Sequence, residues 1–469
     1  MQSCVCRVFV VALFVGGLLA QVQRYELGLR LRQFERHLEK VEQRDLREAA
    51  FTELDGAVQA FFRLDTKSVA KAIDTADCAL HGNDWSVAKR YAHSLQWALD
   101  VRLLAIGSAT LTGKLSQAYR IDDEDYEPGV CSLVIRVPGI AKAIVMPVAE
   151  LPQVITLPVA GIPAGDHMLK WSIVQGDEVL VEREQPLSVV ADLAPRLARL
   201  AVAAKVAKSQ EPATVESKTL PALSSMLQGM QRRRPAETVL FGYEMLAEAE
   251  ALAAWLAKPG EQKAFYGAHR AGSFHLRIPV GKRTIAVRLL VPKTEGTVPL
   301  VMALHGAGGS ENLFFDGYGD GRVVALAGER GWMVVAPRLG LGSIDCASLV
   351  DALARRFPVD PERVLMVGHS MGAMQAVANA VRAPQRYRAV AALGGGGRVR
   401  RNAALKDLPF YVGVGTKDFA RKGANALHQA LLGVGSPSRL QEFAGVEHLA
   451  IVQVALAEVF GFFDESLKR

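Results

Sequence analysis

Residues 363–372 read Arg-Val-Leu-Met-Val-Gly-His-Ser-Met-Gly, and a helix-forming run, Ala-Met-Gln-Ala-Val-Ala, follows at 373–378. The apolar, β-branched start predicts a buried strand, so the G-x-S-x-G motif stands between a strand and a helix. In that context the motif is typical of a nucleophile elbow, a turn so tight that small residues must flank the serine. We therefore expect the Ser370 hydroxyl to project above the edge of a sheet, with the backbone N–H of Met371 facing a developing oxyanion.

The residues on both sides of this stretch alternate between strand-like and helical runs. The predicted strands are 273–279, 284–291, 300–304, 332–336, 363–367, 389–393, 410–415 and 439–443, and the first two form a hairpin. The predicted helices are 321–330, 343–356, 371–381, 422–433 and 449–466. Apolar strands that alternate with helices favour a mostly parallel sheet covered on both faces. The sequence thus predicts an α/β domain over residues 261–469.

Two further side chains are needed before a serine hydroxyl becomes a good nucleophile: a base within hydrogen-bond reach, and a carboxylate that orients the base. The expected chain order is serine, then acid, then histidine. Asp418 follows one predicted strand and His448 follows the next, which places both at the sheet edge of Ser370. Glu447 is an alternative acid, although a neighbour of the histidine cannot easily supply the geometry. His428 lies within a predicted helix and is interpreted as a packing or surface residue.

A glycine-rich segment, Leu-His-Gly-Ala-Gly-Gly at 304–309, follows another predicted strand. Glycines there let backbone amides turn inward, so we expect the second oxyanion donor to be Ala307, or otherwise Gly306. His305 is expected to brace the loop. Glycine-rich loops also cradle phosphates, but no G-K-[ST] follows, which argues against a nucleotide site.

Four segments together carry a resemblance: LHGAGGSEN at 304–312, VDPERVLMVGHSMGA at 359–373, GTKD at 415–418 and VEHL at 446–449. They resemble α/β-hydrolase-fold esterases of the secreted polyhydroxybutyrate depolymerase and feruloyl esterase type. They are also similar to dienelactone-hydrolase-like and prolyl-oligopeptidase-like catalytic domains. The resemblance covers less than half of the chain. It implies the α/β-hydrolase fold, a Ser-Asp-His triad and hydrolysis of carboxylic esters through an acyl-enzyme.

The function has alternatives that the sequence leaves open. A serine peptidase or an acyltransferase would use the same acyl-enzyme chemistry. A catalytically inactive binding or scaffold protein is a third reading, against which the complete set of Ser370, Asp418 and His448 argues. The expected partner is an ester substrate. The aromatic loop at 312–319 either lines the pocket of an aromatic or apolar ester or packs on the body of the domain. The ester substrate could also be a polymer.

The N-terminal residues 1–20 resemble a secretory signal peptide. Arg7 precedes an apolar run over 8–20 that is shorter than a membrane-spanning helix needs. We expect a secreted or periplasmic protein, with membrane attachment only if this segment stays uncleaved as an anchor.

Composition sets further bounds. Of the 469 residues 50% are hydrophobic and 22% charged, which is typical of a folded chain with more than one domain. A net charge of +7 is modest for this length, and without a nucleic-acid-binding module no nucleic-acid partner is expected. If the signal segment is removed, the cysteines that remain are Cys78, Cys131 and Cys346, which are too few and too scattered for a disulfide framework. Without C-x-x-C or His-rich clusters, neither a metal nor another cofactor is expected.

The front of the chain divides into three predicted regions. Residues 21–128 are predicted to be helical, because apolar residues recur at helical spacing at Leu27, Leu31, Phe34 and Leu38, and again at Tyr91, Leu95 and Leu99. Short β-rich runs separated by turns predict a small β-sandwich-like domain over 129–192. Helices return over 193–260. No catalytic grouping stands out in these regions, so we expect a structural or partner-binding role for them.

Overall fold

The computed structural model describes residues 17–121, 131–232, 239–258, 263–340, 342–399 and 403–468. The chain forms two compact units, each assembled from separate stretches. Unit 1 takes Met1–Phe34, Gly56–Val202 and Leu223–Glu250, and unit 2 takes Glu35–Asp55, Ala203–Ala222 and Ala251–Arg469. Most of the predicted signal segment, residues 1–16, lies outside the described residues.

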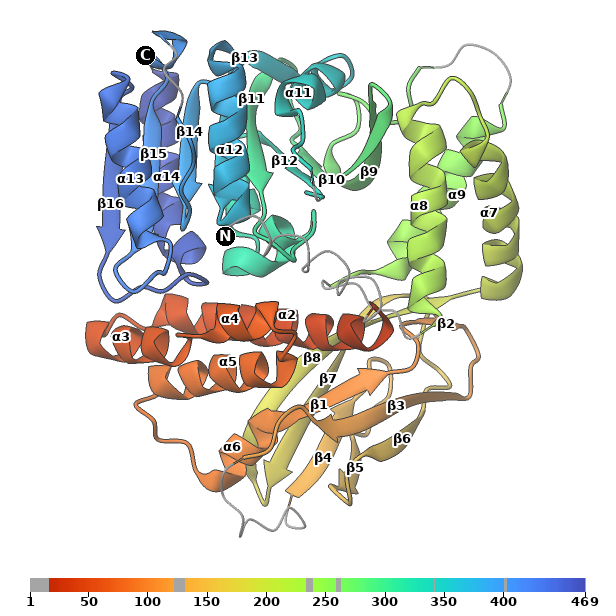
Figure 1. The fold of residues 1–469 in the computed structure, drawn as a ribbon. Coiled ribbons are helices and arrows are strands. Elements are labelled where there is room, and N and C mark those ends of the chain that lie inside the picture. Colours follow the sequence, from red (N-terminus) through yellow and green to blue (C-terminus); the bar gives the residue numbers. More distant parts are fainter. Residues whose placement is uncertain are drawn as a thin grey trace. The chain divides into compact units, whose positions relative to one another are not determined.

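Unit 2 is built on an eight-stranded sheet with the strand order β16-β15-β14-β13-β11-β12-β10-β9 (Figure 1). The strands are β9 (Gly272–Val280), β10 (Arg283–Val291), β11 (Val298–Leu304), β12 (Met333–Pro337), β13 (Val359–His369), β14 (Ala389–Leu393), β15 (Phe410–Gly415) and β16 (Ser438–Phe443). The predicted hairpin is β9–β10, which is antiparallel, and β10 pairs antiparallel with β12. All the other neighbours are parallel. The predicted mostly parallel sheet is therefore confirmed.

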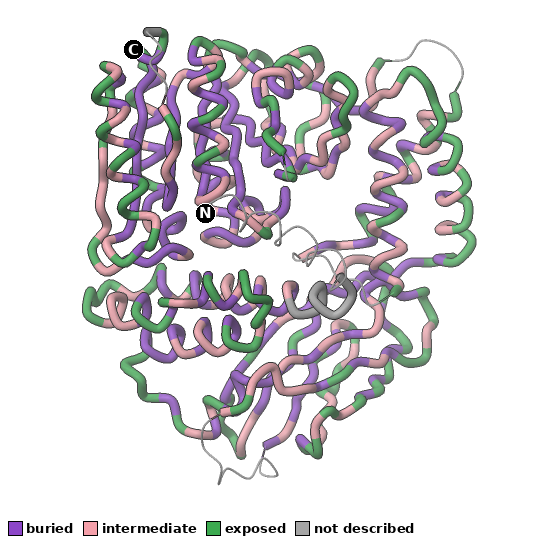
Figure 2. Tube along the Cα trace, viewed as in Figure 1, coloured by how far each residue is buried: buried purple, intermediate pink, exposed green. Residues whose placement is uncertain are grey.

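Helices cover both faces of this sheet. They are α10 (Arg322–Glu329), α11 (Cys346–Ala354), α12 (Met371–Arg382), α13 (Arg421–Gly433) and α14 (Ile451–Leu467). α10 and α14 pack together on one face, while α11, α12 and α13 cover the other. The central strands are consequently buried on both sides, as the continuous purple segments of Figure 2 show. Burial on both faces explains why these strands read as unbroken apolar runs rather than alternating ones.

Segments distant in sequence complete unit 2. Residues 35–55 supply the end of α2 (Gly17–Lys40) and α3 (Arg44–Glu53), and residues 203–222 supply parts of α7 (Leu193–Lys208) and α8 (Val215–Met230). Glu216 on α8 is buried, forms an ion pair with Arg356 and accepts a hydrogen bond from the backbone N–H of Phe265 at 3.1 Å. These polar contacts attach α8 to the region of the eight-stranded sheet. The sequence predicted the α/β domain to begin only at residue 261, so this contribution of α8 was not expected.

Unit 1 contains a β-sandwich with two sheets, ordered β1-β3-β6 and β2-β8-β7-β4-β5. The strands are β1 (Leu95–Leu99), β2 (Leu103–Ala105), β3 (Thr110–Gln117), β4 (Cys131–Arg136), β5 (Ile144–Pro147), β6 (Gln153–Pro158), β7 (Gly165–Gln175) and β8 (Glu178–Val190). Apolar residues of both sheets share one core, in which the rings of Trp97 and Trp171 meet edge to face with centroids 6.3 Å apart. The sandwich expected from the β-rich runs is thus present.

The prediction that residues 21–128 are helical is wrong for 95–117, which form β1, β2 and β3. The helices before them are α4 (Ala57–Phe62), α5 (Thr66–Leu80) and α6 (Val87–Ser94). Tyr91 is helical, whereas Leu95 and Leu99 lie on β1. These two leucines are four residues apart, a spacing that places side chains on one face of a strand as well as of a helix.

Unit 1 contains a buried cluster of charged side chains. Arg30 forms an ion pair with Asp74, whose carboxylate also accepts a hydrogen bond from the Tyr119 hydroxyl at 2.6 Å. Arg183 pairs with Glu26 at 2.6 Å. Two guanidinium groups thus face two carboxylates, and their mutual attraction offsets the desolvation cost of burying these charges. Nothing in the helical or β-rich patterns predicted this pairing.

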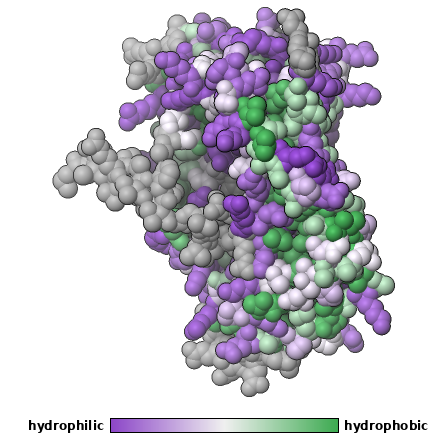
Figure 3. All heavy atoms as spheres, turned by 90° about the vertical axis from the view of Figure 1, so that its right-hand side faces the viewer, coloured by the Kyte–Doolittle hydropathy of each residue, from purple (hydrophilic) through white to green (hydrophobic). Residues whose placement is uncertain are grey.

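The helices that follow the sandwich are α7, α8 and α9 (Gly242–Leu256), as predicted. Val202 and Val206 on α7 are exposed at 66% and 68%. Figure 3 draws the side of the chain that lies to the right in Figure 1, and hydrophobic residues stand among hydrophilic ones there. Scattered apolar side chains of this kind are normal at a surface. None of the described helices combines the length and the apolar composition needed to cross a bilayer.

Candidate active site

Ser370 occupies the sharp turn between β13 and α12. Its backbone has φ 56° and ψ −115°, a conformation that non-glycine residues rarely adopt, and its N–H donates to the carbonyl of Leu393 at 2.9 Å. A Cβ atom added at Gly368 would overlap the carbonyl oxygen of Gly372, and one at Gly372 would overlap the carbonyl oxygen of Leu304. The two glycines of the motif are therefore required by backbone crowding, as expected for an elbow.

His448 and Asp418 meet directly. Nδ1 of His448 lies 2.8 Å from Oδ1 of Asp418, and each residue is only 4% exposed. The same carboxylate oxygen accepts the backbone N–H of Ala420 at 2.7 Å. Because the carboxylate can only accept, the imidazole proton belongs on Nδ1, which leaves Nε2 as a hydrogen-bond acceptor. This is the tautomer that a general base needs.

Two glycines after β14 lie between this pair and the serine. A Cβ added at Gly394 would lie 2.9 Å from Oδ2 of Asp418 and 3.2 Å from Nδ1 of His448. A Cβ added at Gly395 would lie 2.8 Å from the backbone oxygen of Ser370. The structure thus places the Asp418–His448 pair and the backbone of Ser370 beside the same two glycines, at the carboxyl edge of the sheet.

His369 connects the elbow to the histidine loop. Its Nε2 lies 2.9 Å from the carbonyl oxygen of His448, and its Nδ1 lies 2.6 Å from the hydroxyl of Tyr318. Since a carbonyl oxygen can only accept, Nε2–H donates and Nδ1 accepts the hydroxyl proton. Burial lowers the pKa of His369 well below its ordinary value, which keeps the ring neutral. His369 lies in the elbow motif and Tyr318 in the aromatic loop, but neither pattern predicts a contact between them, so sequence reasoning missed this connection.

His305 holds the glycine-rich loop in shape. Its Nε2 accepts the backbone N–H of Leu339 at 2.9 Å, and its Nδ1 donates to the carbonyl of Gly306 at 2.7 Å. Burial lowers the pKa of His305, so the neutral ring with one donor and one acceptor fits both contacts. These contacts agree with the bracing role expected from the sequence.

The predicted oxyanion donors lie on both sides of the serine. A Cβ added at Gly306 would lie 3.5 Å from Cβ of Ser370, so the glycine-rich loop reaches the nucleophile. Ala307, the next residue, is half-buried. Met371 is the first residue of α12, where helix N–H groups lack partners within the helix. The glycine-rich loop and the start of α12 thus lie beside Ser370, and their role as oxyanion donors stays a prediction.

Glu447, the alternative acid, faces away from the imidazole contact. Its carboxylate accepts the backbone N–H groups of Leu449 at 2.8 Å and Ala450 at 2.7 Å, at the start of α14. Burial raises the pKa of Glu447 to about 8. Glu447 therefore caps a helix, whereas Asp418 makes the contact with His448.

Aromatic rings near the site separate into a buried and an exposed group. Phe314 and Tyr318 of the aromatic loop are buried and meet edge to face with centroids 4.9 Å apart, and Phe315 is buried beneath the guanidinium of Arg288. These rings pack the loop on the domain. Phe419, in contrast, is 58% exposed and its ring centroid lies 4.2 Å from that of His448. Phe419 follows Asp418 directly, and no motif singled it out.

Among the residues of unit 2 that the structure describes, no three histidine, cysteine or carboxylate side chains converge as a metal site would require. The chemistry that the arrangement supports is that of a serine, an imidazole and a carboxylate.

Comparison with known proteins points to the same region. Residues 346–430 match the model of the Esterase family, a stretch that contains Ser370 and Asp418 and ends before His448. No curated protein matches the sequence.

Solved structures resemble the fold. A ferulic acid esterase is 17% identical with a TM-score of 0.37, covering 42% of this chain and 98% of its own. An S-formylglutathione hydrolase from Staphylococcus aureus is 14% identical with a TM-score of 0.34, covering 41% and 98%. A thermostable esterase is 14% identical with a TM-score of 0.39, covering 79% and 98%.

Proposed function

We propose that the C-terminal region of this chain is a carboxylic ester hydrolase of the α/β-hydrolase fold, and that its reaction proceeds at Ser370 through an acyl-enzyme. Nε2 of His448 accepts the hydroxyl proton while Oγ of Ser370 attacks the ester carbonyl carbon. Asp418 fixes the Nδ1–H tautomer of the imidazole and stabilises the imidazolium that forms.

The tetrahedral intermediate carries a negative oxygen that needs preorganised donors. We assign this role to the backbone N–H of Met371 at the start of α12 and to that of Ala307, with Gly306 as the alternative on the same loop. Fixed amides at the N-terminus of a helix stabilise a negative charge without reorganising during the reaction. Collapse of the intermediate expels the alcohol, which takes the proton from His448. Water then attacks the acyl-enzyme, with His448 again as base.

The observation that carries this proposal is the 2.8 Å contact between His448 and Asp418 at the sheet edge where the strained backbone of Ser370 lies. A buried imidazole with one nitrogen held by a carboxylate is prepared to accept a proton on the other. Each of the three residues follows the carboxyl end of a parallel strand of this sheet, β13, β15 or β16.

The test is hydrolysis of short p-nitrophenyl esters by the purified protein and by the variants S370A and H448A. We expect turnover by the unmodified protein and a fall of roughly 10³-fold or more in kcat for each variant, to the residual level that binding and the oxyanion hole support. Turnover by S370A at the rate of the unmodified protein would contradict the assignment. A parallel panel of peptide p-nitroanilides tests for peptidase activity, and added alcohols test for acyl transfer.

Two finer points belong to the same proposal. The exposed ring of Phe419 beside His448 favours an ester with an aromatic or apolar group, because an apolar surface at the mouth of a site binds such groups. A comparison of feruloyl and short-chain alkyl esters on F419A tests this preference.

We also propose export of the protein, supported by the signal-like residues 1–20. The N-terminal sequence of the protein recovered from its host tests that.

A further inference from the structure

We propose that Tyr318 and Glu35 are positioning residues, through which residues 35–55 hold the His448 loop in place for attack by Ser370. This inference rests on the proposed function and extends it to a segment far from the catalytic residues in sequence. We refer to Glu35–Asp55, which belongs to unit 2, as the brace segment.

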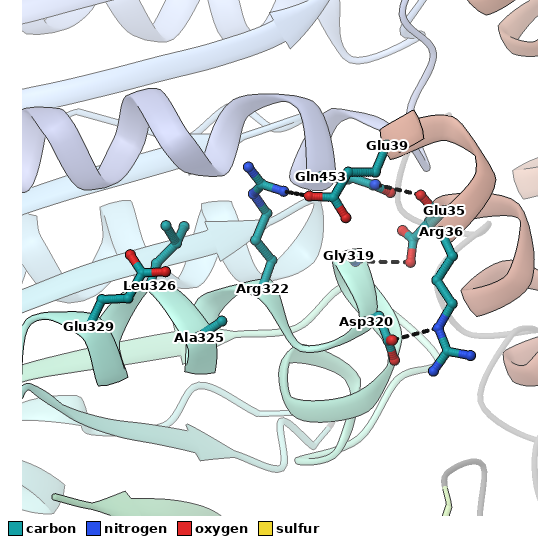
Figure 4. A pocket seen from close by; sticks show the side chains of 10 residues that line it. All are labelled: Glu35, Arg36, Glu39, Gly319, Asp320, Arg322, Ala325, Leu326, Glu329 and Gln453. Atoms are coloured by element: carbon teal, nitrogen blue, oxygen red, sulfur yellow. Dashed lines mark hydrogen bonds and ion pairs between the residues drawn. The ribbon is translucent and has the colours of Figure 1, made fainter. Parts of the chain in front are cut away.

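The first step is the contact of Glu35 with the domain. Oε2 of Glu35 accepts the backbone N–H of Gly319 at 2.9 Å, and its backbone oxygen accepts Nε2 of Gln453 at 2.8 Å (Figure 4). Glu35 is only 1% exposed, so both hydrogen bonds are formed out of water. Charge-assisted hydrogen bonds to a buried carboxylate are stronger than neutral ones. The end of α2 is thereby attached to the helical turn Tyr318–Asp320 and to α14.

The second step leads from Gly319 to the imidazole. Gly319 adopts a left-handed conformation, with φ 58°, and its neighbour Tyr318 points its hydroxyl to Nδ1 of His369. His369 in turn donates from Nε2 to the carbonyl oxygen of His448. Tyr318 and His369 are both buried. The path from the Glu35 contact to the backbone of His448 therefore runs through the Tyr318–Gly319 peptide, the side chains of Tyr318 and His369, and the hydrogen bond that each of these two side chains makes.

The brace segment also contacts the loops of the other catalytic residues. Oγ1 of Thr52 accepts a hydrogen bond from Nζ of Lys417 at 2.7 Å, one residue before Asp418. Gly445, with φ 75°, approaches Glu48 so closely that an added Cβ would lie 2.8 Å from its Cγ. Contacts at three loops, those of Tyr318, Asp418 and His448, are what a structural support for the reacting geometry requires.

Two ion pairs in the same region serve as a comparison. Arg36 pairs with Asp320 at 2.6 Å, and Arg322 pairs with Glu39 at 2.5 Å, around a pocket of about 320 Å³. Figure 4 shows these side chains beside Glu35, and neither ion pair includes a residue of the hydrogen-bond path to His448. Arg36 and Glu39 are more than half exposed, so the pairs stabilise little. They offer matched controls on the same helix.

The physical consequence concerns the rate of the chemical step. A base displaced by about 1 Å can lose roughly 10²-fold in rate, because proton transfer needs a near-attack geometry. In Y318F, Nδ1 of His369 loses its donor within a buried site, so the ring is no longer fixed in the tautomer that donates to His448. In E35A, Gly319 loses its acceptor, whereas E35Q retains an acceptor oxygen.

The experiment measures kcat, KM, thermal midpoint and the rate of fluorophosphonate labelling for Y318F, E35A, E35Q and the control E39Q. We expect Y318F and E35A to lose about tenfold or more in kcat, with KM within about twofold, since the path acts on the base and not on substrate contacts. Labelling should slow by the same factor. E35Q should recover most of the rate, and E39Q should match the unmodified protein.

Two outcomes would decide against the inference. Unchanged kcat and labelling in folded Y318F would overturn it, as would a loss in E39Q equal to that in E35A. If E35A does not fold, the comparison of Y318F with E39Q and E35Q decides alone. Failure of the underlying function is recognised separately, because in that case S370A would hydrolyse esters as fast as the unmodified protein.

Discussion

The backbone oxygen of His448 accepts a hydrogen bond from His369, the residue that directly precedes Ser370, while the imidazole of His448 contacts Asp418. The proposed base is thus held at two points, one on its main chain and one on its ring. Both contacts are buried, at 2.9 Å and 2.8 Å. Because a rigidly held base reacts from one geometry only, the rate should be sensitive to each point separately.

The contact on the ring gives the first prediction. In D418N the amide can donate as well as accept, so Nδ1 no longer has to carry the proton and the wrong tautomer becomes available. We expect kcat to fall by about 10³–10⁴-fold with the fold retained. The control is E447Q, because Glu447 caps α14 and does not contact the imidazole. Equal losses in both variants, measured with p-nitrophenyl esters, would contradict the assignment of Asp418.

The buried carboxyl of Glu447 gives a second prediction, on pH and stability. Burial raises the pKa of Glu447 from 4.5 to about 8, so the folded protein retains this proton to higher pH than the unfolded chain does. The stability that it contributes is fully present below the unfolded pKa and is lost as the pH rises through the folded pKa. Urea unfolding should show the free energy of unfolding falling between about pH 5 and about pH 8.5. In E447Q this fall should be smaller, and an identical pH dependence in both proteins would refute the prediction.

The crowded elbow gives a third prediction. G372A adds a methyl group that overlaps the carbonyl oxygen of Leu304, so the end of β11 or the elbow must shift. We expect a loss of about 1–3 kcal/mol in the free energy of unfolding, together with loss of ester hydrolysis. The matched control is G328A in α10, where an added Cβ meets nothing within 4 Å.

That control should gain stability rather than lose it. Alanine within a helix is favoured over glycine by roughly 0.5–1 kcal/mol, so G328A should be slightly more stable and fully active. Denaturant unfolding of both variants makes the comparison. Equal effects of the two substitutions would mean that the crowding at Gly372 has no consequence.

The brace of the glycine-rich loop gives a fourth prediction. In H305A the carbonyl of Gly306 and the N–H of Leu339 both lose their partner. The loop should loosen, and kcat should fall by up to the ~10²–10³-fold that loss of one oxyanion donor costs, with little change in KM. Steady-state kinetics with a short ester measure this split. A rise in KM at unchanged kcat would instead place His305 in substrate binding.

The sequence predicted the mostly parallel sheet and its helices well because their signals are local. Strands buried on both faces read as apolar runs, and the glycines beside Ser370 are required by backbone crowding that a motif records. Asp418 and His448 could be found because the chain order of such residues and the ends of predicted strands restrict the choice.

Other features depend on contacts between distant segments, which no local pattern records. Glu35 bonds to Gly319 across 284 positions, and Tyr318 bonds to His369 across 51. A glutamate at the end of an amphipathic helix looks like any surface residue until its burial is seen. Leu95 and Leu99 were assigned to a helix because a four-residue spacing fits both a helix and a strand. Tertiary pairing of β1 with β3 decides between the two.

The most direct test of the central claim is fluorophosphonate labelling of the purified protein, followed by identification of the modified peptide by mass spectrometry. Such probes form a covalent bond with a serine that an adjacent base activates. We predict stoichiometric modification of Ser370, no labelling of S370A, and greatly slowed labelling of H448A. Modification of a different residue, or unchanged labelling in S370A, would contradict the account.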